Sequence, residues 1–556
     1  MPGKRTKKVT AKAGKKKEEE KVIPSFPPYF YYGLLFLEIA FVFGVRLRLM
    51  NMPLERDEGE YAYMGQLLLR GIPPYKIAYN MKLPGTYVSY AAIMGVFGET
   101  RSAIHLGLAF INIATIVLVY LLGRRLSGQA GGITASATYG VTSLSPSVLG
   151  FAGHATHFVV LGSTAGALLL LKATEREGKL RPFFLSGLLM GIAFIMKQPG
   201  ALFIAFGAVY VVFTEWQRRS SWRVMGRALG LYCLGAALPY ALTCILLTYA
   251  GAFPAFWFWT VSYAAQYASQ VRLAVGIHIF WSTLHDVCMP AIWLWILGGF
   301  GLIACLWNRE ERSDAQFVLV FFAFSFLAVC PGLLFRPHYF ILLLPALSLL
   351  VAIAISTGIR LIKEFSSSRV TVCVPAMAFL LALGAAIYQQ RAFFFELDPT
   401  GACRMVYGVN PFPEAILIAD YIRNHSTADA RIAVLGSEPE IYFYANRLSA
   451  TGYIYTYPLM EEQKYAEDMQ RQMIDEIEKG QPEYLVVVQM QDSWLVHPNS
   501  QMRIFSWANR YAGEHYDLAG TANIHPASTE YRWDENAKTP AAHAPLSVLV
   551  FKRKSS

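Results

Sequence analysis

The chain has 556 residues, of which 54% are hydrophobic and 14% aromatic, and its mean hydropathy is +0.35. This composition excludes an ordinary soluble protein, because the apolar residues come in runs of about 20, the length that crosses a bilayer. The formal net charge of +11 would suit nucleic acid, but no basic surface interleaved with aromatic residues is present. We therefore expect a polytopic α-helical membrane protein with a second, smaller domain, and no nucleic-acid binding.

The N-terminal segment is strongly basic. Residues 1–21 hold nine lysines and arginines against three glutamates, so this stretch cannot bury a core. Positive charge beside a membrane segment favours the cytoplasm, so residues 1–28 are expected to form a cytoplasmic tail that touches membrane lipids. The apolar segment 29–50 is too long for a signal peptide and should be retained, in a bacterial inner or plasma membrane.

Hydropathy predicts about 11 spanning helices in a membrane domain that covers residues 29–390. The apolar stretch 84–97 is too short to be a secure span. If it is re-entrant or interfacial, every later basic loop lies on the cytoplasmic side, as the positive-inside rule requires. The expected helix cores are 29–50, 102–122, 129–149, 157–173, 182–197, 199–215, 225–249, 287–307, 315–334, 339–359 and 370–389.

This topology gathers the ionisable loop groups on the extracytoplasmic face. Such groups are costly at membrane depth and are usually functional, so a site at that lipid–water boundary is the simplest explanation. The segments concerned are the outer loop 51–101, the turn 154–157, Lys197-Gln198-Pro199, the long aromatic loop 250–286 and Arg336-Pro337-His338-Tyr339.

Residues 391–556 have the composition of a soluble protein and are expected to form an extracytoplasmic α/β domain over the site. The turn 436–440 follows a strand but lacks a glycine-rich phosphate-binding motif, so we interpret it as a structural connection. The function of this domain, in acceptor docking or in shielding the site, stays open. Strands are predicted at 431–435, 484–488 and 547–551, and helices at 415–424, 439–446 and 461–479.

The outer loop begins with two adjacent carboxylates, Asp57 and Glu58. A carboxylate at the membrane–water boundary can act as a general base, and its neighbour can tune it or orient an acceptor. The alternative is that Asp57-Glu58 caps the following helix, where negative charge suits the dipole. Both functions can coexist, and we expect catalysis here.

Several cations and polar groups of the same face could hold an anionic substrate. Lys82 could bind a phosphate at headgroup level, and Lys197 is a weaker candidate; snorkelling to the interface is the alternative for both. Arg336 offers the planar fork that suits phosphate, with His338 and Tyr339 beside it. His154 and His157 are spaced to share a helical face; we expect polar contacts near the site rather than a divalent metal, for which further ligands are not evident.

The chain resembles the C-type glycosyltransferases over residues 29–390, in particular the branch of the protein O-mannosyltransferases and the lipid A aminoarabinose transferases. The motifs that carry the resemblance are Asp57-Glu58 with the following Tyr61, the Lys-x-Pro element Lys82 to Pro84, the helix end Leu121-Leu122-Gly123-Arg124-Arg125, and the stretch from Arg336 to Ala346. One departure is the second outer loop, where many relatives carry another acidic residue and this chain has Gly153-His154-Ala155-Thr156-His157.

The resemblance implies a polyprenyl-monophosphate-linked sugar as donor, no certain cofactor, and transfer with inversion to a protein, lipid or glycan acceptor. On that interpretation Asp57 deprotonates the acceptor hydroxyl, while Lys82 and Arg336 stabilise the leaving phosphate. Two alternatives remain. A lipid-sugar transporter or flippase would favour repeated halves and charges near the bilayer midplane, and a non-catalytic envelope scaffold would be indifferent to loss of Asp57.

Overall fold

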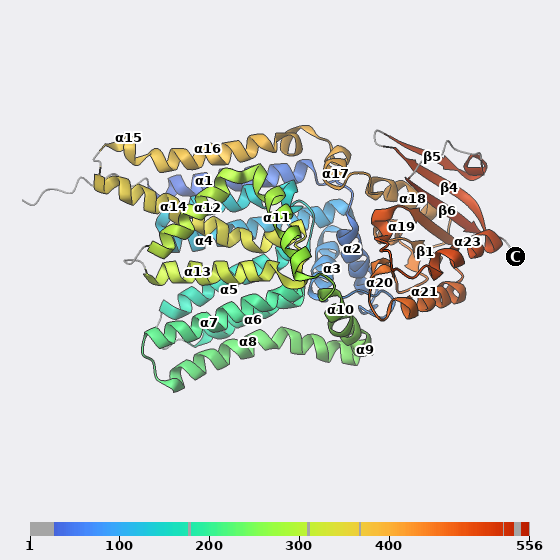
Figure 1. Cartoon of the computed structure of the whole chain (residues 1–556), viewed down its shortest axis with the longest axis horizontal. Coiled ribbons are helices and arrows are strands. Elements are labelled where there is room, and N and C mark those ends of the chain that lie inside the picture. The colour runs from blue at the N-terminus through green and yellow to red at the C-terminus, as the bar shows by residue number, and fades with distance from the viewer. Residues whose placement is uncertain are drawn as a thin grey trace, which may run out of the picture.

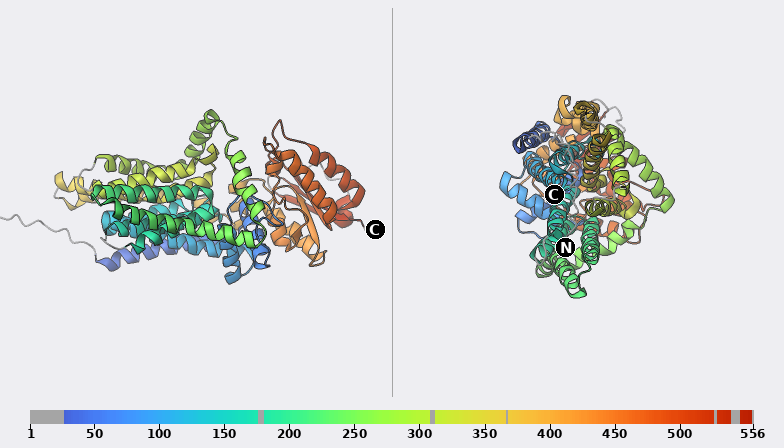
Figure 2. Two further views of the ribbon diagram at one scale, coloured as in Figure 1. Left: turned by 90° about the horizontal axis from the view of Figure 1, so that it is seen from below. Right: turned by 90° about the vertical axis from the view of Figure 1, so that its left-hand side faces the viewer.

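The computed structural model describes residues 27–175, 180–307, 312–365, 368–525, 528–538 and 546–554. Its long axis joins a bundle of apolar helices at one end to a sheet-containing domain at the other (Figure 1). The left-hand view of Figure 2 shows the same separation from below. The predicted class, a helical membrane protein with a C-terminal α/β domain, is confirmed.

Seven described helices are long and apolar enough to cross a membrane, and four further apolar helices are shorter. The predicted number of about 11 spans therefore stays a prediction. The long ones are α1 (Pro28–Arg48), α4 (Arg101–Thr142), α5 (Ala155–Glu175), η2 with α7 (Gln198–Gln217), α8 (Trp222–Tyr249), α11 with η4 and α12 (Leu273–Trp307) and η6 with α14 (Pro337–Phe365). The shorter ones are α3 (Gly85–Phe97), α6 (Arg181–Met196), α13 (Arg312–Val329) and α16 (Val374–Gln389).

Helix α4 contains a sharp break that the sequence analysis treats as a loop between two spans. Its 42 residues leave helical geometry at Ser127 and Gly128, where Gly128 has φ +73°. A positive φ is easy only for glycine, so the chain turns here between the predicted cores 102–122 and 129–149. Helix α3, at 13 residues, rises only about 20 Å and is too short to span, as predicted for 84–97.

The predicted aromatic loop 250–286 is wrong as a loop, because most of it is helical. Aromatic side chains there pack on one another and on the sheet domain, as Trp259 does with Tyr79 and Tyr453, and this packing stabilises short helical turns. The elements are α9 (Phe253–Trp257), the π-helix η3 (Phe258–Tyr263), α10 (Ala264–Ala268) and the start of α11 (Leu273–Cys288).

A mixed six-stranded sheet forms the core of the C-terminal domain, in the order β2-β1-β3-β6-β4-β5. Strands β2, β1 and β3 are parallel, and β6, β4 and β5 continue the sheet in antiparallel pairs. The three predicted strands are β1, β3 and β6. The sequence analysis missed β2, β4 and β5, because their residues lack a clear apolar alternation. The strands are β1 (Arg431–Leu435), β2 (Leu448–Ser449), β3 (Tyr484–Gln489), β4 (Tyr516–Ile524), β5 (Thr529–Trp533) and β6 (Leu546–Arg553).

The helices of this domain cover the sheet and carry the connections to the bundle. The predicted helices correspond to α18, α19 and α21. The helices are α17 (Pro399–Tyr407), α18 (Phe412–Asn424), α19 (Glu440–Ala445), α20 (Tyr457–Met460), α21 (Ala466–Gly480), α22 (Gln491–Trp494) and α23 (Arg503–His515). The remaining short elements are η1 (Pro146–Val148), η5 (Pro331–Leu333), α15 (Arg369–Val372), η7 (Ala392–Glu396) and η8 (Asp534–Lys538).

Helix α2 (Arg56–Leu69) lies with α3 between the bundle and the sheet domain (Figure 1). One side of α2 packs on α3 and the other on α19. Ten of its 14 residues are buried although its sequence is not strongly apolar. The outer loop is thus enclosed by protein on both sides, and this is where the candidate site lies.

Candidate active site

Helix α2 begins with a capping box that leaves Asp57 free for other contacts. The Glu55 carboxylate accepts a hydrogen bond from the Glu58 backbone N–H at 3.0 Å, and the Glu58 carboxylate accepts one from the Glu55 N–H at 3.3 Å. These bonds satisfy backbone donors that the first helical turn leaves unpaired. The cap is therefore built by Glu55 and Glu58, not by the adjacent pair Asp57-Glu58.

Glu58 is buried, and its contacts differ from those of Asp57. Its Oε1 accepts from the Gly153 backbone N–H at 2.6 Å and lies 3.1 Å from His105 Nε2. Gly153 is needed here, because a Cβ at that position would lie 2.2 Å from the Tyr90 hydroxyl. These contacts fasten the turn that carries His154 to the start of α2.

Asp57 and Glu60 lie one helical turn apart and both bind Lys82. The Lys82 ammonium lies 2.7 Å from Asp57 Oδ1 and 2.6 Å from Glu60 Oε2. The rings of Tyr61 and Tyr455 lie 4.7 and 5.3 Å from the same nitrogen, within cation–π range. The structure thus brings together the predicted acid, the predicted cation and Tyr61.

In this cluster, burial and ion pairing shift the pKa of each charged group in opposite directions. Burial alone would raise the pKa of Asp57, but Lys82 and His154 lower it well below its usual value. Burial raises the pKa of Glu60, and Lys82 only partly offsets this. Burial would lower the pKa of Lys82, yet Asp57 and Glu60 raise it well above its usual value. At neutral pH Lys82 is charged and Asp57 is ionised.

Hydrogen bonds from side chains to backbone carbonyls fix the Lys82 segment, one within the outer loop and two to the turn that carries Lys197. The Tyr75 hydroxyl donates to the Lys82 carbonyl at 2.6 Å, and the Gln198 amide donates to the Met81 carbonyl at 2.7 Å. The Thr86 hydroxyl donates to the Met196 carbonyl at 3.0 Å. Two segments more than 100 residues apart in sequence are therefore fixed side by side.

In the described part of the chain, Lys197 and Arg336 differ from Lys82 in having no carboxylate partner. Among the described residues, no hydrogen bond or ion pair is found for either side chain. The Lys197 ammonium lies over the Tyr339 ring, 4.1 Å from its centroid, and burial lowers its pKa to about 7. Arg336 is exposed. These are the two cations of the site that an anion can bind without displacing a carboxylate.

The segment that carries Arg336 reaches the Asp57 cluster through His338. The His338 ring stacks on that of His154 at 4.1 Å, and His154 Nδ1 lies 3.6 Å from Asp57 Oδ2. Arg336 precedes His338 by two residues, and the Tyr339 ring that lies under Lys197 follows it. That the acid and all three cations form one site stays a prediction.

The histidine pair at the site is His154 with His338, rather than His154 with His157. The rings of His154 and His338 stack at 4.1 Å with an interplanar angle of 10°. His154 Nδ1 lies 3.6 Å from Asp57 Oδ2 and 3.7 Å from Glu55 Oε1. His157 is also buried, but among the described residues no hydrogen bond, ion pair or ring contact is found between its side chain and Asp57, Lys82 or His338.

Asp57, His154 and His338 offer three ligand atoms within 4.8 Å of one another, which is close enough for a metal ion to be considered. An imidazole nitrogen binds a metal along its lone pair, in the plane of its own ring. Two stacked rings inclined by only 10° have no common point close to both planes. The pair as placed does not converge on one ion, and no step of the chemistry is assigned to a metal.

Two residues of the site were missed by the sequence analysis. Glu60 follows Asp57 at the i,i+3 spacing that puts both on one helical face, a signal that was available. Tyr455 donates its hydroxyl to Asp57 Oδ1 at 2.8 Å across 398 residues of sequence. No local pattern could have indicated this contact.

Comparison with known proteins supports the resemblance. Residues 84–245 match the family described as dolichyl-phosphate-mannose-protein mannosyltransferase. The chain is 26% identical over 332 residues to an undecaprenyl phosphate-alpha-4-amino-4-deoxy-L-arabinose arabinosyl transferase of Serratia proteamaculans. That match covers 57% of each chain.

Two solved structures share the fold. ArnT from Cupriavidus metallidurans, bound to undecaprenyl phosphate, aligns with a TM-score of 0.60 and 15% identity over 94% of this chain and 98% of its own. AglB from Archaeoglobus fulgidus, in complex with an inhibitory peptide and a dolichol-phosphate, aligns with a TM-score of 0.52 and 14% identity over 92% of this chain and 75% of its own. The chain is therefore an integral membrane protein that resembles the C-type glycosyltransferases, close to the protein mannosyltransferase and aminoarabinose transferase branch.

Proposed function

We propose that this protein is an inverting glycosyltransferase. It moves a sugar from a polyprenyl-monophosphate-linked donor to an acceptor hydroxyl at the extracytoplasmic face of the membrane. The observation that carries the proposal is the ion pair of Asp57 with Lys82, from which a row of rings (His154, His338 and Tyr339) leads to Lys197. Within the described residues, Lys197 and the nearby Arg336 have no carboxylate partner. The printed ligands of the similar structures, undecaprenyl phosphate and dolichol-phosphate, support a lipid phosphate.

The charges of the cluster suggest how the phosphate is held. With both carboxylates ionised, Lys82, Asp57 and Glu60 together carry a net charge of −1, which alone would repel a phosphodiester. Lys197 and Arg336 supply the attraction, Arg336 through its planar fork. Lys82 has three N–H donors, of which two go to carboxylates, so the third can reach the bridging phosphate oxygen and stabilise the charge that develops there.

Asp57 is placed to be the general base through its second oxygen. Oδ1 accepts from Lys82 and Tyr455, whereas Oδ2 lies 3.6 Å from His154 Nδ1 and accepts no hydrogen bond from the described residues. The acceptor hydroxyl gives its proton to Oδ2 as its oxygen bonds to the anomeric carbon. The bond from that carbon to the phosphate oxygen breaks, and polyprenyl phosphate leaves. As the Lys82 ammonium shifts from Asp57 towards the phosphate, it stabilises the Asp57 carboxylate less. The pKa of Asp57 therefore rises, and Asp57 becomes a stronger base.

Glu58 positions the turn of His154 through the hydrogen bond that it accepts from the Gly153 N–H, and His157 is buried three residues after His154. Both act as supporting residues of the site. Tyr61, Tyr339 and His338 shape the walls around the cations. We place the site, the sheet domain and the acceptor on the extracytoplasmic side, with the N-terminus in the cytoplasm.

The test is to incubate the purified full chain with a panel of polyprenyl-phosphate sugars and to measure released polyprenyl phosphate. Asp57→Asn should lower the rate roughly 10²- to 10⁴-fold, the usual contribution of a general base, and should leave donor binding intact. Asp468→Asn makes the same change at a side chain that is 82% exposed on α21, and is the control. A rate for Asp57→Asn above a tenth of wild type would refute the assignment and favour a transporter or a scaffold.

A further inference from the structure

A tyrosine of the C-terminal domain reaches the reacting acid. The Tyr455 hydroxyl donates to Asp57 Oδ1 at 2.8 Å, and its ring lies 5.3 Å from the Lys82 ammonium. Tyr455 is only 7% exposed. The contact therefore joins the sheet domain to the cluster in a place that solvent barely reaches.

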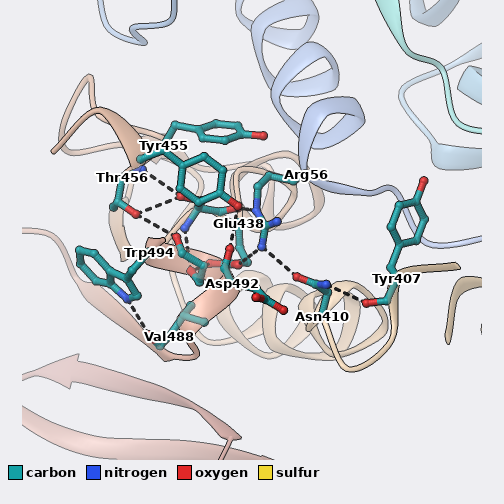
Figure 3. Close-up of polar contacts among 12 residues, drawn as sticks. Arg56, Tyr407, Asn410, Glu438, Tyr455, Thr456, Val488, Asp492 and Trp494 are labelled. Atoms are coloured by element: carbon teal, nitrogen blue, oxygen red, sulfur yellow. Dashed lines mark hydrogen bonds and ion pairs between the residues drawn. The ribbon is translucent and has the colours of Figure 1, made fainter. Parts of the chain in front are cut away.

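The C-terminal domain also binds Arg56, the residue before Asp57. The Arg56 guanidinium donates to the Ser437 carbonyl at 2.6 Å, to Glu438 Oε1 at 3.0 Å and to Asn410 Oδ1 at 3.1 Å (Figure 3). Glu438 is fully buried. Its other oxygen accepts from the Ser493 hydroxyl at 2.6 Å. An ion pair with a buried partner and further hydrogen bonds holds its geometry far better than an exposed pair does.

The two contacts are linked inside the sheet domain. Ser437 lies in the turn after β1, and its hydroxyl accepts from the Thr456 backbone N–H at 3.0 Å. The Thr456 hydroxyl in turn donates to the Ser493 carbonyl at 3.1 Å. The turn that binds Arg56 therefore also fixes the chain next to Tyr455. Adjacent residues of α2, Arg56 and Asp57, are therefore held by two segments of the sheet domain that are hydrogen-bonded to each other.

We propose that the C-terminal domain is part of the catalytic centre, with Tyr455 as a positioning residue for Asp57 and the Arg56–Glu438 pair as the clamp that sets Tyr455. The inference rests on the proposed function, in which Asp57 is the base. By occupying Oδ1 together with Lys82, Tyr455 keeps Oδ2 turned to the acceptor. The domain therefore does more than dock an acceptor or cover the site, and the turn 436–440 has a function in catalysis.

The first test removes one hydroxyl and keeps the ring. Tyr455→Phe should lower kcat roughly 10- to 100-fold, the effect of losing a hydrogen bond to a charged group, with KM for the donor within about twofold of wild type. Tyr453→Phe is the matched control on the same segment, since its hydroxyl donates to Gln472 and not to Asp57, and should keep the wild-type kcat. A wild-type kcat in Tyr455→Phe, or a loss confined to KM, would overturn the proposal.

The second test asks whether the clamp acts through the tyrosine. Glu438→Gln should lower kcat in the same direction, and the double variant with Tyr455→Phe should be no slower than the slower single variant, because both changes remove one function. Multiplicative losses would show that the clamp and Tyr455 act independently and would refute the link.

A measurement that needs no activity separates this inference from the proposed function. Hydrogen exchange of the α2 segment 56–61 should speed up at least about tenfold in Glu438→Gln and in Tyr455→Phe, and not in Tyr453→Phe. If wild type transfers no sugar but this exchange pattern is found, the proposed function fails while the clamp stands. If wild type is active and exchange is unchanged in both variants, the clamp is refuted.

Discussion

Replacement of Lys82 by methionine tests the geometry of the cluster most directly. In the described structure, Glu60 forms an ion pair with Lys82 alone, and Asp57 forms one with Lys82 and one with His154. Its loss leaves two carboxylates one helical turn apart. The Asp57 side chain is 19% exposed and keeps some hydration, whereas Glu60 is 0% exposed. The cost of the change is therefore mainly that of an uncompensated charge at Glu60.

The magnitude follows from that burial. Removing one partner of a buried pair costs about 3–5 kcal/mol, and we expect the lower end, about 3 kcal/mol, because Asp57 is partly solvated. In Lys82→Met the pKa of Glu60 is no longer held down by the ammonium, so its folded pKa lies further above the unfolded one. Stability of the variant should rise as the pH falls and Glu60 takes up a proton.

The assay is thermal unfolding of the purified chain in detergent, with the double variant Lys82→Met/Glu60→Gln as the decisive sample. Glu60→Gln removes the uncompensated charge, and the amide oxygen can still accept from the Tyr87 hydroxyl that now lies 2.7 Å from Glu60. Stability should return, but sugar transfer should not. Lys76→Met, at an exposed lysine of the same loop, is the control. Our reasoning is refuted if Lys82→Met is as stable as Lys76→Met, or if Glu60→Gln adds to its loss.

Two further predictions concern the free cation and the domain contact. Burial lowers the pKa of Lys197 to about 7, so its charge is lost as the pH rises through neutrality, and the affinity for a phosphodiester donor analogue should fall by up to about tenfold per pH unit above that value. The side chain in Lys197→Arg stays charged, so the affinity of this variant should depend less on pH. Calorimetric affinities of wild type that are equal on both sides of pH 7 would contradict this. In Gly59→Ala a Cβ would lie 2.6 Å from both Cβ and the backbone nitrogen of Glu440, so overpacking should cost about 1–3 kcal/mol in thermal unfolding. Gly44→Ala, where a Cβ meets nothing within 4 Å, should be neutral, and equal effects of the two changes would disprove the close approach of α2 to α19.

Much of the fold could be predicted because hydropathy is a local property. Apolar runs of the right length became the helices of the bundle, and the strands β1, β3 and β6 are short apolar runs in a polar context. The failures have a common cause. The residues of β4 and of the aromatic segment 250–286 take their structure from neighbours that are distant in sequence, such as the ring of Tyr453 against Trp259.

The sequence by itself determined the class of the protein, the segment in which we propose the site, and the types of charged residue found there, because composition and residue order specify length, hydropathy and charge. Only the tertiary structure decided which groups pair. It assigned Lys82 to two carboxylates, left Lys197 and Arg336 without one among the described residues, stacked His154 on His338, and brought Tyr455 to Asp57 across 398 residues. The physical reason is that a hydrogen bond or ion pair acts over about 3–4 Å in space, and that distance is set by packing, which sequence separation does not record.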